Sequence, residues 1–161
     1  MKRMHHFKKI SFLLLLSSVV LVSSCNKDDD APAAQNITQI VVSSPDFSLL
    51  KTAVVRAGLD GTLATTQNLT VFAPNNAAFT AAGLTEAVIN STPVATLQAI
   101  LQYHVLGTKV ISSAVPAGPN AEVATLGGVK LFATKNANGV YVNGVKVITA
   151  DVSASNGVIH V

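Results

Sequence analysis

The residues that could do chemistry in this chain are two of its four histidines, His104 and His160, one cysteine, Cys25, and eight carboxylates. A zinc site needs several His, Cys, Asp or Glu ligands at close spacing, and no acid lies at ligand spacing beside either histidine. A serine hydrolase needs an activated serine, and the sequence contains no Gly-x-Ser-x-Gly elbow. The sequence therefore predicts no catalytic residue, no metal and no cofactor, and we expect the protein not to be an enzyme.

The cysteine closes an N-terminal segment that is typical of export. A basic stretch at 2–9 precedes an apolar stretch at 10–22, and Val22-Ser23-Ser24-Cys25 follows with small residues before the cysteine. This arrangement resembles a bacterial lipoprotein signal. As a helix the apolar stretch spans about 20 Å, short of the roughly 30 Å of a hydrocarbon core, so a stable membrane span is not expected. We expect residues 1–24 to be removed and Cys25 to carry a lipid that anchors the protein to a membrane; the alternative is a plain signal peptide with an incidental cysteine.

The charge of the chain depends on that cleavage. The formal net charge of +3 includes the basic residues of the export segment. Without residues 1–24 the chain keeps seven Lys and Arg against eight Asp and Glu, a net charge of −1. Nucleic-acid binding requires a surplus of clustered cations, so we exclude nucleic acid as a partner.

Residues 25–35 read as a lipidated acidic tether. Lys27-Asp28-Asp29-Asp30 follows the cysteine, and small residues and a proline come next. Adjacent carboxylates repel one another and favour a solvated spacer. The same run resembles the surface-export signal of lipoproteins in the Bacteroidetes. We expect the lipid to place the protein in the cell envelope, anchored at the outer membrane. Because the run can be a spacer or an export signal, the sequence leaves open whether the protein faces the periplasm or the outside.

Residues 36–161 are long enough for one domain with one core. The first half favours helices, each marked by a capping residue or proline at its start and a glycine at its end. We expect helices from Ser44-Pro45 to Gly58, with Phe47, Leu50, Val54 and Ala57 inward; from Asn75 to Gly83, with Ala78 and Phe79 inward; and from Thr92-Pro93 to near Gly107, with Val94, Leu97, Ile100, Leu101 and His104 on one side.

Short runs rich in Val, Ile and Thr predict the strands. These are Leu69–Ala73 and, after Gly107, Lys109–Ser112, Val123–Leu126, Val129–Thr134, Val140–Val142 and Val145–Thr149. Gly127-Gly128, Asn138-Gly139 and Asn143-Gly144 separate the later runs, and Asn-Gly is a strong hairpin signal. Helices first and hairpins later indicate the α+β class.

Three ordered blocks resemble the fasciclin-like domain family. They are Thr70-Val71-Phe72-Ala73-Pro74 running on to Phe79, then Tyr103-His104, then Asn156-Gly157-Val158-Ile159-His160-Val161. The resemblance implies N-terminal helices packed on a mostly antiparallel β-sheet wedge or sandwich, a structural role for Thr70, Phe72, Pro74, Phe79, Asn156, Gly157 and His160, and no enzymatic activity. The family's last strand continues past its histidine, whereas this chain stops at Val161. We therefore expect a clipped final strand with an exposed sheet edge, or a chain that is a fragment.

The resemblance also implies candidate partner contacts at Tyr103, His104, Asp151 and Val152. Each has a structural alternative. His104 and His160 are equally interpreted as buried, hydrogen-bonded histidines, and Asp151 as a local hydrogen-bond acceptor before a turn.

The function implied by the resemblance is adhesion or extracellular-matrix interaction by a lipid-anchored envelope protein. The partner would be an unknown surface or matrix protein or a polysaccharide, and the lipid would supply the membrane contact. The alternative is an envelope protein that binds a small molecule or a lipid, which would require an apolar cavity the size of a ligand.

Overall fold

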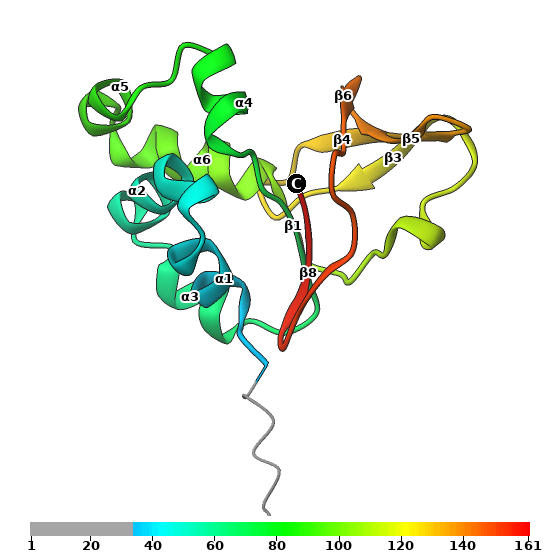
Figure 1. Cartoon of the computed structure of the whole chain (residues 1–161), viewed down its shortest axis with the longest axis horizontal. Helices are drawn as coiled ribbons and strands as arrows, with labels where there is room; N and C mark the ends of the chain where they lie inside the picture. The colour runs from blue at the N-terminus through cyan, green and yellow to red at the C-terminus, as the bar shows by residue number, and fades with distance from the viewer. Residues whose placement is uncertain (1–33) are drawn as a thin grey trace, which may run out of the picture. The chain divides into compact units, whose positions relative to one another are not determined.

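The computed structural model describes residues 34–161 (Figure 1). The predicted signal peptide at 1–24, the lipidation site Cys25 and all but the end of the tether at 25–35 lie outside the described residues. Within 34–161, no helix is both long enough and apolar enough to cross a membrane.

The described helices are short. They are α1 Ile37–Ser43, η1 Pro45–Phe47, α2 Ser48–Ala57, α3 Asp60–Thr65, α4 Asn76–Ala81, α5 Glu86–Ser91, α6 Val94–Tyr103 and η2 Ser112–Ala114. The sequence did not predict α1, α3 and α5, because six or seven residues are too few to display a helical period. A capping box formed by Asn36 and Gln39 fixes the start of α1.

Two of the predicted capping positions are confirmed, at the end of α2 and at the start of α4. α2 ends at Gly58, which adopts a left-handed φ of 67°. The Asn75 side chain caps α4 by accepting from the Ala78 N–H at 2.9 Å. Phe79 is buried as expected, but Ala78 is exposed, so that part of the prediction was wrong.

The buried face of α6 is narrower than predicted. Leu97 and Leu101 are buried, one turn apart, whereas Val94 and Ile100 are each 43% exposed. The helix ends at Tyr103 and not near Gly107, because the residues that follow it form a strand against β1.

The first sheet has the strand order β2-β1-β8-β7. Its strands are β1 Leu69–Phe72, β2 Val105–Leu106, β7 Val152–Ala154 and β8 Gly157–His160. β1 and β8 run parallel, with Leu69 opposite Gly157 and Phe72 opposite His160, so this sheet is mixed. All four residues of β8 pair with β1, and Gly157, Val158 and Ile159 also pair with β7; the exposed edge that we expected at this strand is therefore absent over 157–159.

The second sheet is an antiparallel meander in the order β3-β4-β5-β6. Its strands are β3 Gly118–Ala124, β4 Lys130–Asn136, β5 Gly139–Val142 and β6 Val145–Lys146. The predicted Asn143-Gly144 turn joins β5 to β6, with φ values of 48° and 82°. A two-residue hairpin turn of type I′ requires positive φ at both of its central residues.

The first sheet separates two apolar groups. Leu69, Val71 and Ile159 belong to the main core cluster together with side chains of α1, α2 and α6. Leu106, Val158 and Leu131 are also buried but lie outside that cluster, on the opposite face of the first sheet and on β4. Figure 1 shows helices α1 to α6 on one side of β1 and β8 and strands β3 to β6 on the other. The α+β prediction is confirmed in this layering.

Candidate functional site

A stretch of backbone at 108–112, hereafter the 108–112 segment, runs beside the first sheet without being a strand, and its last residue, Ser112, begins η2. The buried hydroxyl of Thr70 on β1 donates to the Thr108 carbonyl at 2.7 Å and accepts from the Val110 N–H at 2.8 Å. One side chain therefore makes the two hydrogen bonds that a neighbouring strand would otherwise supply.

His160 on β8 holds the same segment. Its Nε2 donates to the Val110 carbonyl at 2.8 Å, and its Nδ1 accepts from the Asp151 N–H at 3.2 Å. A neutral ring with its proton on Nε2 satisfies both bonds. The ring is 5% exposed and stacks on Phe72 at 5.5 Å between centroids. Neither ring nitrogen of His160 is available to a metal or a substrate in this arrangement.

Asp151 also holds the 108–112 segment against the first sheet. Its carboxylate accepts from the N–H and the hydroxyl of Ser112, the former at 2.7 Å. These two hydrogen bonds hold the pKa of the Asp151 carboxyl below its usual range, because they stabilise the charged form. Asp151 itself has a left-handed φ of 60°, which aspartate tolerates better than most residues.

These contacts explain why the strand predicted at Lys109–Ser112 is wrong. The residue types favour a strand, but the backbone groups of Thr108, Val110 and Ser112 pair with side chains and not with another strand. Sequence reasoning had no local signal for this, because those side chains come from distant parts of the chain.

Val152 lies in the sheet and not on a projecting loop. It pairs with Ile159 and packs, half-buried, against the main core cluster. In the Asp151-Val152 pair, the Asp151 side chain is exposed but hydrogen-bonded to Ser112, and the Val152 side chain packs against the core.

Tyr103 links the helices to the second sheet. Its hydroxyl accepts from Asn143 Nδ2 at 2.8 Å, and Asn143 Oδ1 accepts from the Phe132 N–H at 2.9 Å. Sequence reasoning identified Asn143 as a turn residue and missed this side-chain role. The only sequence signal at Asn143, the Asn-Gly pair, predicts a backbone turn and not the contacts of the side chain.

His104 caps α6 and is half-buried, not buried as the structural interpretation expected. Its Nδ1 donates to the Ile100 carbonyl at 2.7 Å, and its own carbonyl accepts from the Phe72 N–H at 2.9 Å. No described residue hydrogen-bonds to its Nε2. Among the described residues, the His104 ring therefore has one nitrogen, Nε2, without a hydrogen-bond partner.

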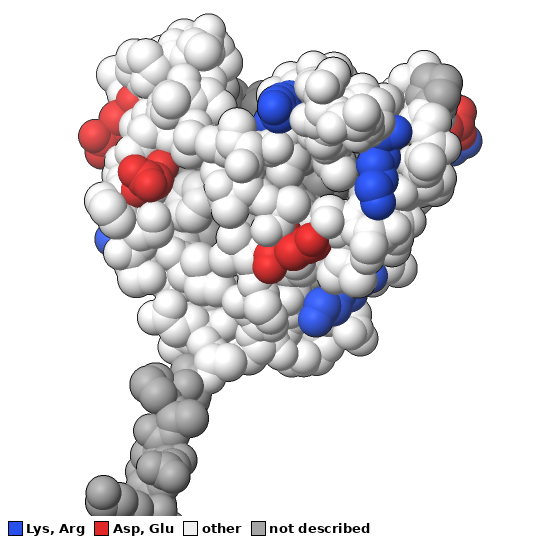
Figure 2. Space-filling view, turned by 45° about the vertical axis from the view of Figure 1, so that its right-hand side comes forward, with Lys and Arg blue, Asp and Glu red and all other residues white. Residues whose placement is uncertain are grey.

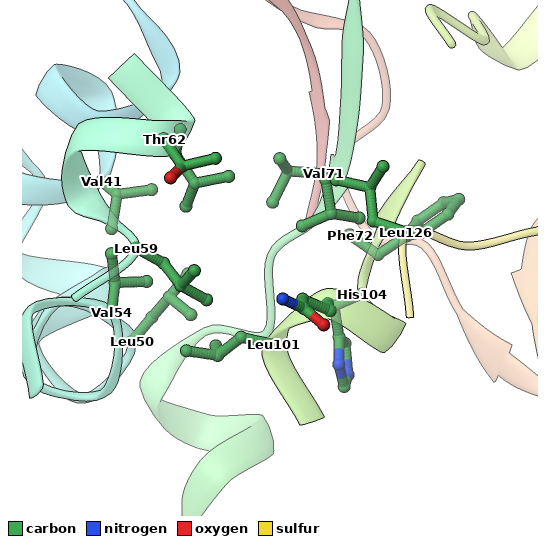
Figure 3. Close-up of a pocket in the computed structure, with 13 residues that line it drawn as sticks. Val41, Leu50, Val54, Leu59, Thr62, Val71, Phe72, Leu101, His104 and Leu126 are labelled. Atoms are coloured by element: carbon green, nitrogen blue, oxygen red, sulfur yellow. The ribbon is translucent and has the colours of Figure 1, made fainter. Parts of the chain in front are cut away.

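A small apolar cavity lies between the helices and β1, with His104 at its rim (Figure 3). Its volume is about 60 Å³, and its walls include Leu50, Val54, Val71 and Leu101. Pockets for small organic ligands typically occupy about 300–1,000 Å³. A wider hollow of about 510 Å³ between α2 and α5 is open to solvent and lined by Lys51, Thr52, Val55, Arg56 and Asn90. Neither of these two hollows is the enclosed apolar cavity of ligand size that the ligand-binding alternative requires.

Asn156 and Gly157 join the first sheet to the helices. The buried Asn156 accepts from the Ile37 N–H at 3.0 Å and donates to the carbonyls of Leu63 and Thr66, each at 2.8 Å. A Cβ on Gly157 would lie 2.2 Å from the Leu69 carbonyl oxygen, so only glycine fits.

Two further motif residues follow β1. Ala73 donates its N–H to the His160 carbonyl at 2.8 Å, and Pro74 then ends the pairing between β1 and β8. Phe79 on α4 packs into the main core cluster.

The charged side chains and the possible metal ligands within residues 34–161 do not mark a further site. On the face drawn in Figure 2, acidic and basic side chains are scattered among uncharged ones. Within residues 34–161, no group of three or more His, Cys, Asp or Glu side chains is placed to hold a metal ion.

Comparisons with known proteins agree with this geometry. A family model described as Fasciclin domain matches residues 45–161. The chain is 40% identical over 131 residues to protein sll1483 of Synechocystis sp., covering 80% of this chain and 71% of that protein. It is 34% identical over 129 residues to the transforming growth factor-beta-induced protein ig-h3 of Sus scrofa, covering 80% of this chain and 19% of that protein.

The fold has a counterpart among solved structures. A FAS1 domain pair from the insect cell adhesion molecule Fasciclin I matches with a TM-score of 0.64 and 17% identity, over 79% of this chain and 49% of that one. At this identity the match shows the shared fold alone. The chain spans less than half of the insect pair and about a fifth of ig-h3, so it corresponds to one part of each.

Proposed function

The chain belongs to the fasciclin domain family, and on that premise we propose that it is a lipid-anchored, non-catalytic adhesion module of a bacterial cell envelope. Fasciclin domains are associated with cell adhesion and extracellular-matrix interaction. The partner would be a surface or matrix protein or a polysaccharide, and the lipid on Cys25 would hold the domain at the membrane.

The observation that supports an adhesive function is the engagement of the motif side chains in internal contacts. Thr70, Asn156 and His160 are buried, and every polar side-chain atom that the three carry is hydrogen-bonded within the domain. Such side chains build a scaffold and leave recognition to the outer surface. This arrangement suits a protein that works by surface contact better than one that encloses a substrate.

Within that surface, the rim of the small cavity is the best-supported contact. His104 lines the cavity while its ring, with the unused Nε2, points away from it (Figure 3), and Leu126, which also lines the cavity, is 48% exposed. A polar atom beside exposed apolar surface is the usual composition of a protein interface. Tyr103 and Asp151 are less suited, because the Tyr103 hydroxyl and the Asp151 carboxylate already have partners.

Cell adhesion with matched variants tests this contact. Cells that display the full chain are washed over matrix-coated surfaces, with His104→Ala compared with Val94→Ala. Both positions lie on or next to α6 and are solvent-accessible, but Val94 is at the opposite end of the helix. We expect His104→Ala to reduce attachment several-fold and Val94→Ala to leave it unchanged. Equal attachment by both variants, at equal surface display, would remove His104 from the interface.

The lipid anchor has its own test. Cys25→Ser should abolish labelling by a clickable fatty acid and shift the protein out of the membrane fraction. A wild-type protein that takes up no label would refute the anchor. Replacing residues 27–30 with alanines should leave the label intact but reduce protease access on whole cells, as expected for a Bacteroidetes-type export signal. Unchanged access would make that run a spacer.

A further inference from the structure

The tripeptide Asn-Gly-Val occurs three times in the described residues, at 138–140, 143–145 and 156–158. Asparagine before glycine is prone to spontaneous deamidation, because glycine has no Cβ to hinder attack by its backbone nitrogen on the asparagine side chain. The three sites are identical over the reactive asparagine and the two residues that follow it. Large differences in their reactivity therefore report on the fold.

The reaction needs no cofactor. The glycine nitrogen bonds to the asparagine Cγ, the Cγ–Nδ2 bond breaks, and ammonia leaves with the proton of the backbone amide. The succinimide ring then takes up one water at either carbonyl and opens to aspartate or isoaspartate. The asparagine side chain must turn toward the next backbone nitrogen, so hydrogen bonds that fix its amide group oppose the reaction.

Asn156 is the most strongly held of the three. Only 3% of it is exposed, its Oδ1 accepts from the Ile37 N–H, and its Nδ2 donates to two carbonyls on and just after α3. Ring closure would break all three bonds inside the core and leave buried groups unpaired, which is costly.

Asn143 is exposed but held at both ends of its amide. Its Oδ1 accepts from the Phe132 N–H on β4, and its Nδ2 donates to the Tyr103 hydroxyl on α6. The two partners lie on different layers of the domain. Turning the side chain toward Gly144 would break both contacts.

Asn138 differs from both. It lies in the exposed turn between β4 and β5, and within residues 34–161 no hydrogen bond fixes its side chain. Only its backbone N–H is held, by Asn136 Oδ1 at 2.8 Å. Gly139 has a φ of 120°, which side-chain-bearing residues rarely adopt, so the turn itself requires the glycine that permits the reaction.

We propose that Asn138 is a site of spontaneous deamidation in the folded domain and that Asn143 and Asn156 are protected by their side-chain hydrogen bonds. Lys146 on β6 supports the assignment, because its Cε lies 3.9 Å from where a Cβ on Gly139 would be. A nearby ammonium favours the negative charge that develops during ring closure and the carboxylate that results. The product adds one negative charge to the tip of the β4–β5 hairpin.

The test follows the purified full-length protein over time at neutral and mildly alkaline pH, with peptide mapping by mass spectrometry. We expect the peptide containing Asn138 to gain the mass of an amide-to-acid conversion first, and faster at higher pH because the attacking nitrogen must lose its proton. In denaturant the three sites should convert at similar rates. Asn138→Gln should remove the early product, since glutamine would have to close a less favourable six-membered ring.

Tyr103→Phe tests the protective mechanism. It removes the acceptor for Asn143 Nδ2 and should raise conversion at Asn143 several-fold without changing that at Asn138. Two results would overturn the proposal. One is native-state conversion at Asn143 or Asn156 that equals that at Asn138; the other is an unreacted Asn138 over a period in which the denatured chain converts.

Discussion

Replacing Gly157 with alanine should destabilise the domain more than any other single methyl addition at its glycines. The new Cβ would lie 2.2 Å from the Leu69 oxygen and 2.9 Å from the Ile37 side chain. Because ordinary contacts begin near 3.4 Å, β1 and β8 would have to separate by more than an ångström. The hydrogen bond from the Leu69 N–H to the Asn156 carbonyl is already 3.2 Å long and would not survive that movement.

The size of the effect follows from those two losses. Overpacking costs about 1–3 kcal/mol, and the loss of this backbone hydrogen bond adds roughly 1 kcal/mol, so we expect about 2–4 kcal/mol in all. For a domain of this size that corresponds to a fall in melting temperature of roughly 10–20 °C.

Gly61→Ala is the matched control, because it adds the same methyl group where nothing lies within 4 Å. Gly61 is inside α3, so the change should stabilise the domain by about 0.5–1 kcal/mol. Thermal denaturation followed by circular dichroism measures both variants. If Gly157→Ala melts within a few degrees of wild type, the close approach of β1 and β8 does not constrain position 157 as described.

Two further predictions concern the 108–112 segment. Thr70→Val keeps the shape of the side chain but leaves the Thr108 carbonyl and the Val110 N–H without their hydrogen-bond partner, and should lower the free energy of unfolding by about 2–4 kcal/mol. Thr70→Ser keeps the hydroxyl and should lower it by about 1 kcal/mol. Chemical denaturation measures both variants, and equal losses would mean that the hydroxyl contributes nothing. The folded state lowers the pKa of Asp151, so its stabilisation is complete above the ordinary carboxyl pKa of about 4 and is lost as the pH falls through the lowered value. The difference in melting temperature between wild type and Ser112→Ala should therefore shrink at low pH, and a difference that does not vary with pH would contradict this role for the carboxylate.

The elements that could be predicted from sequence are those with local signals. Gly58 ends α2, Asn75 caps α4 and Asn143-Gly144 forms a hairpin turn, because each depends only on its own backbone conformation. The partnership of β1 with β8 could not be predicted, since the two strands are far apart in the sequence and a run such as Leu69–Phe72 does not specify its neighbour.

The candidate site was predictable only as a set of residues. The resemblance to fasciclin-like domains singled out Thr70, Asp151 and His160, but not that all three would hold the backbone of one segment. Half-burial of His104 was also missed, because its place at the end of α6 depends on where the helix stops. Such arrangements arise from tertiary contacts, which override local propensity.

The parallel pairing of β1 with β8 has a consequence for how the domain folds. β8 lies inside the first sheet, yet its residues follow nearly all the rest of the described chain. Forming this pair requires closure of a very long loop, and folding rates fall as contacts become more distant in sequence. We expect the helices to collapse early, and the main core to stay open on the side of the sheet until residues 157–160 have been added. We therefore expect Leu69 and Val71 to be accessible to a protease or a chaperone during that interval, so that slower insertion of β8 would shorten the lifetime of the newly made protein.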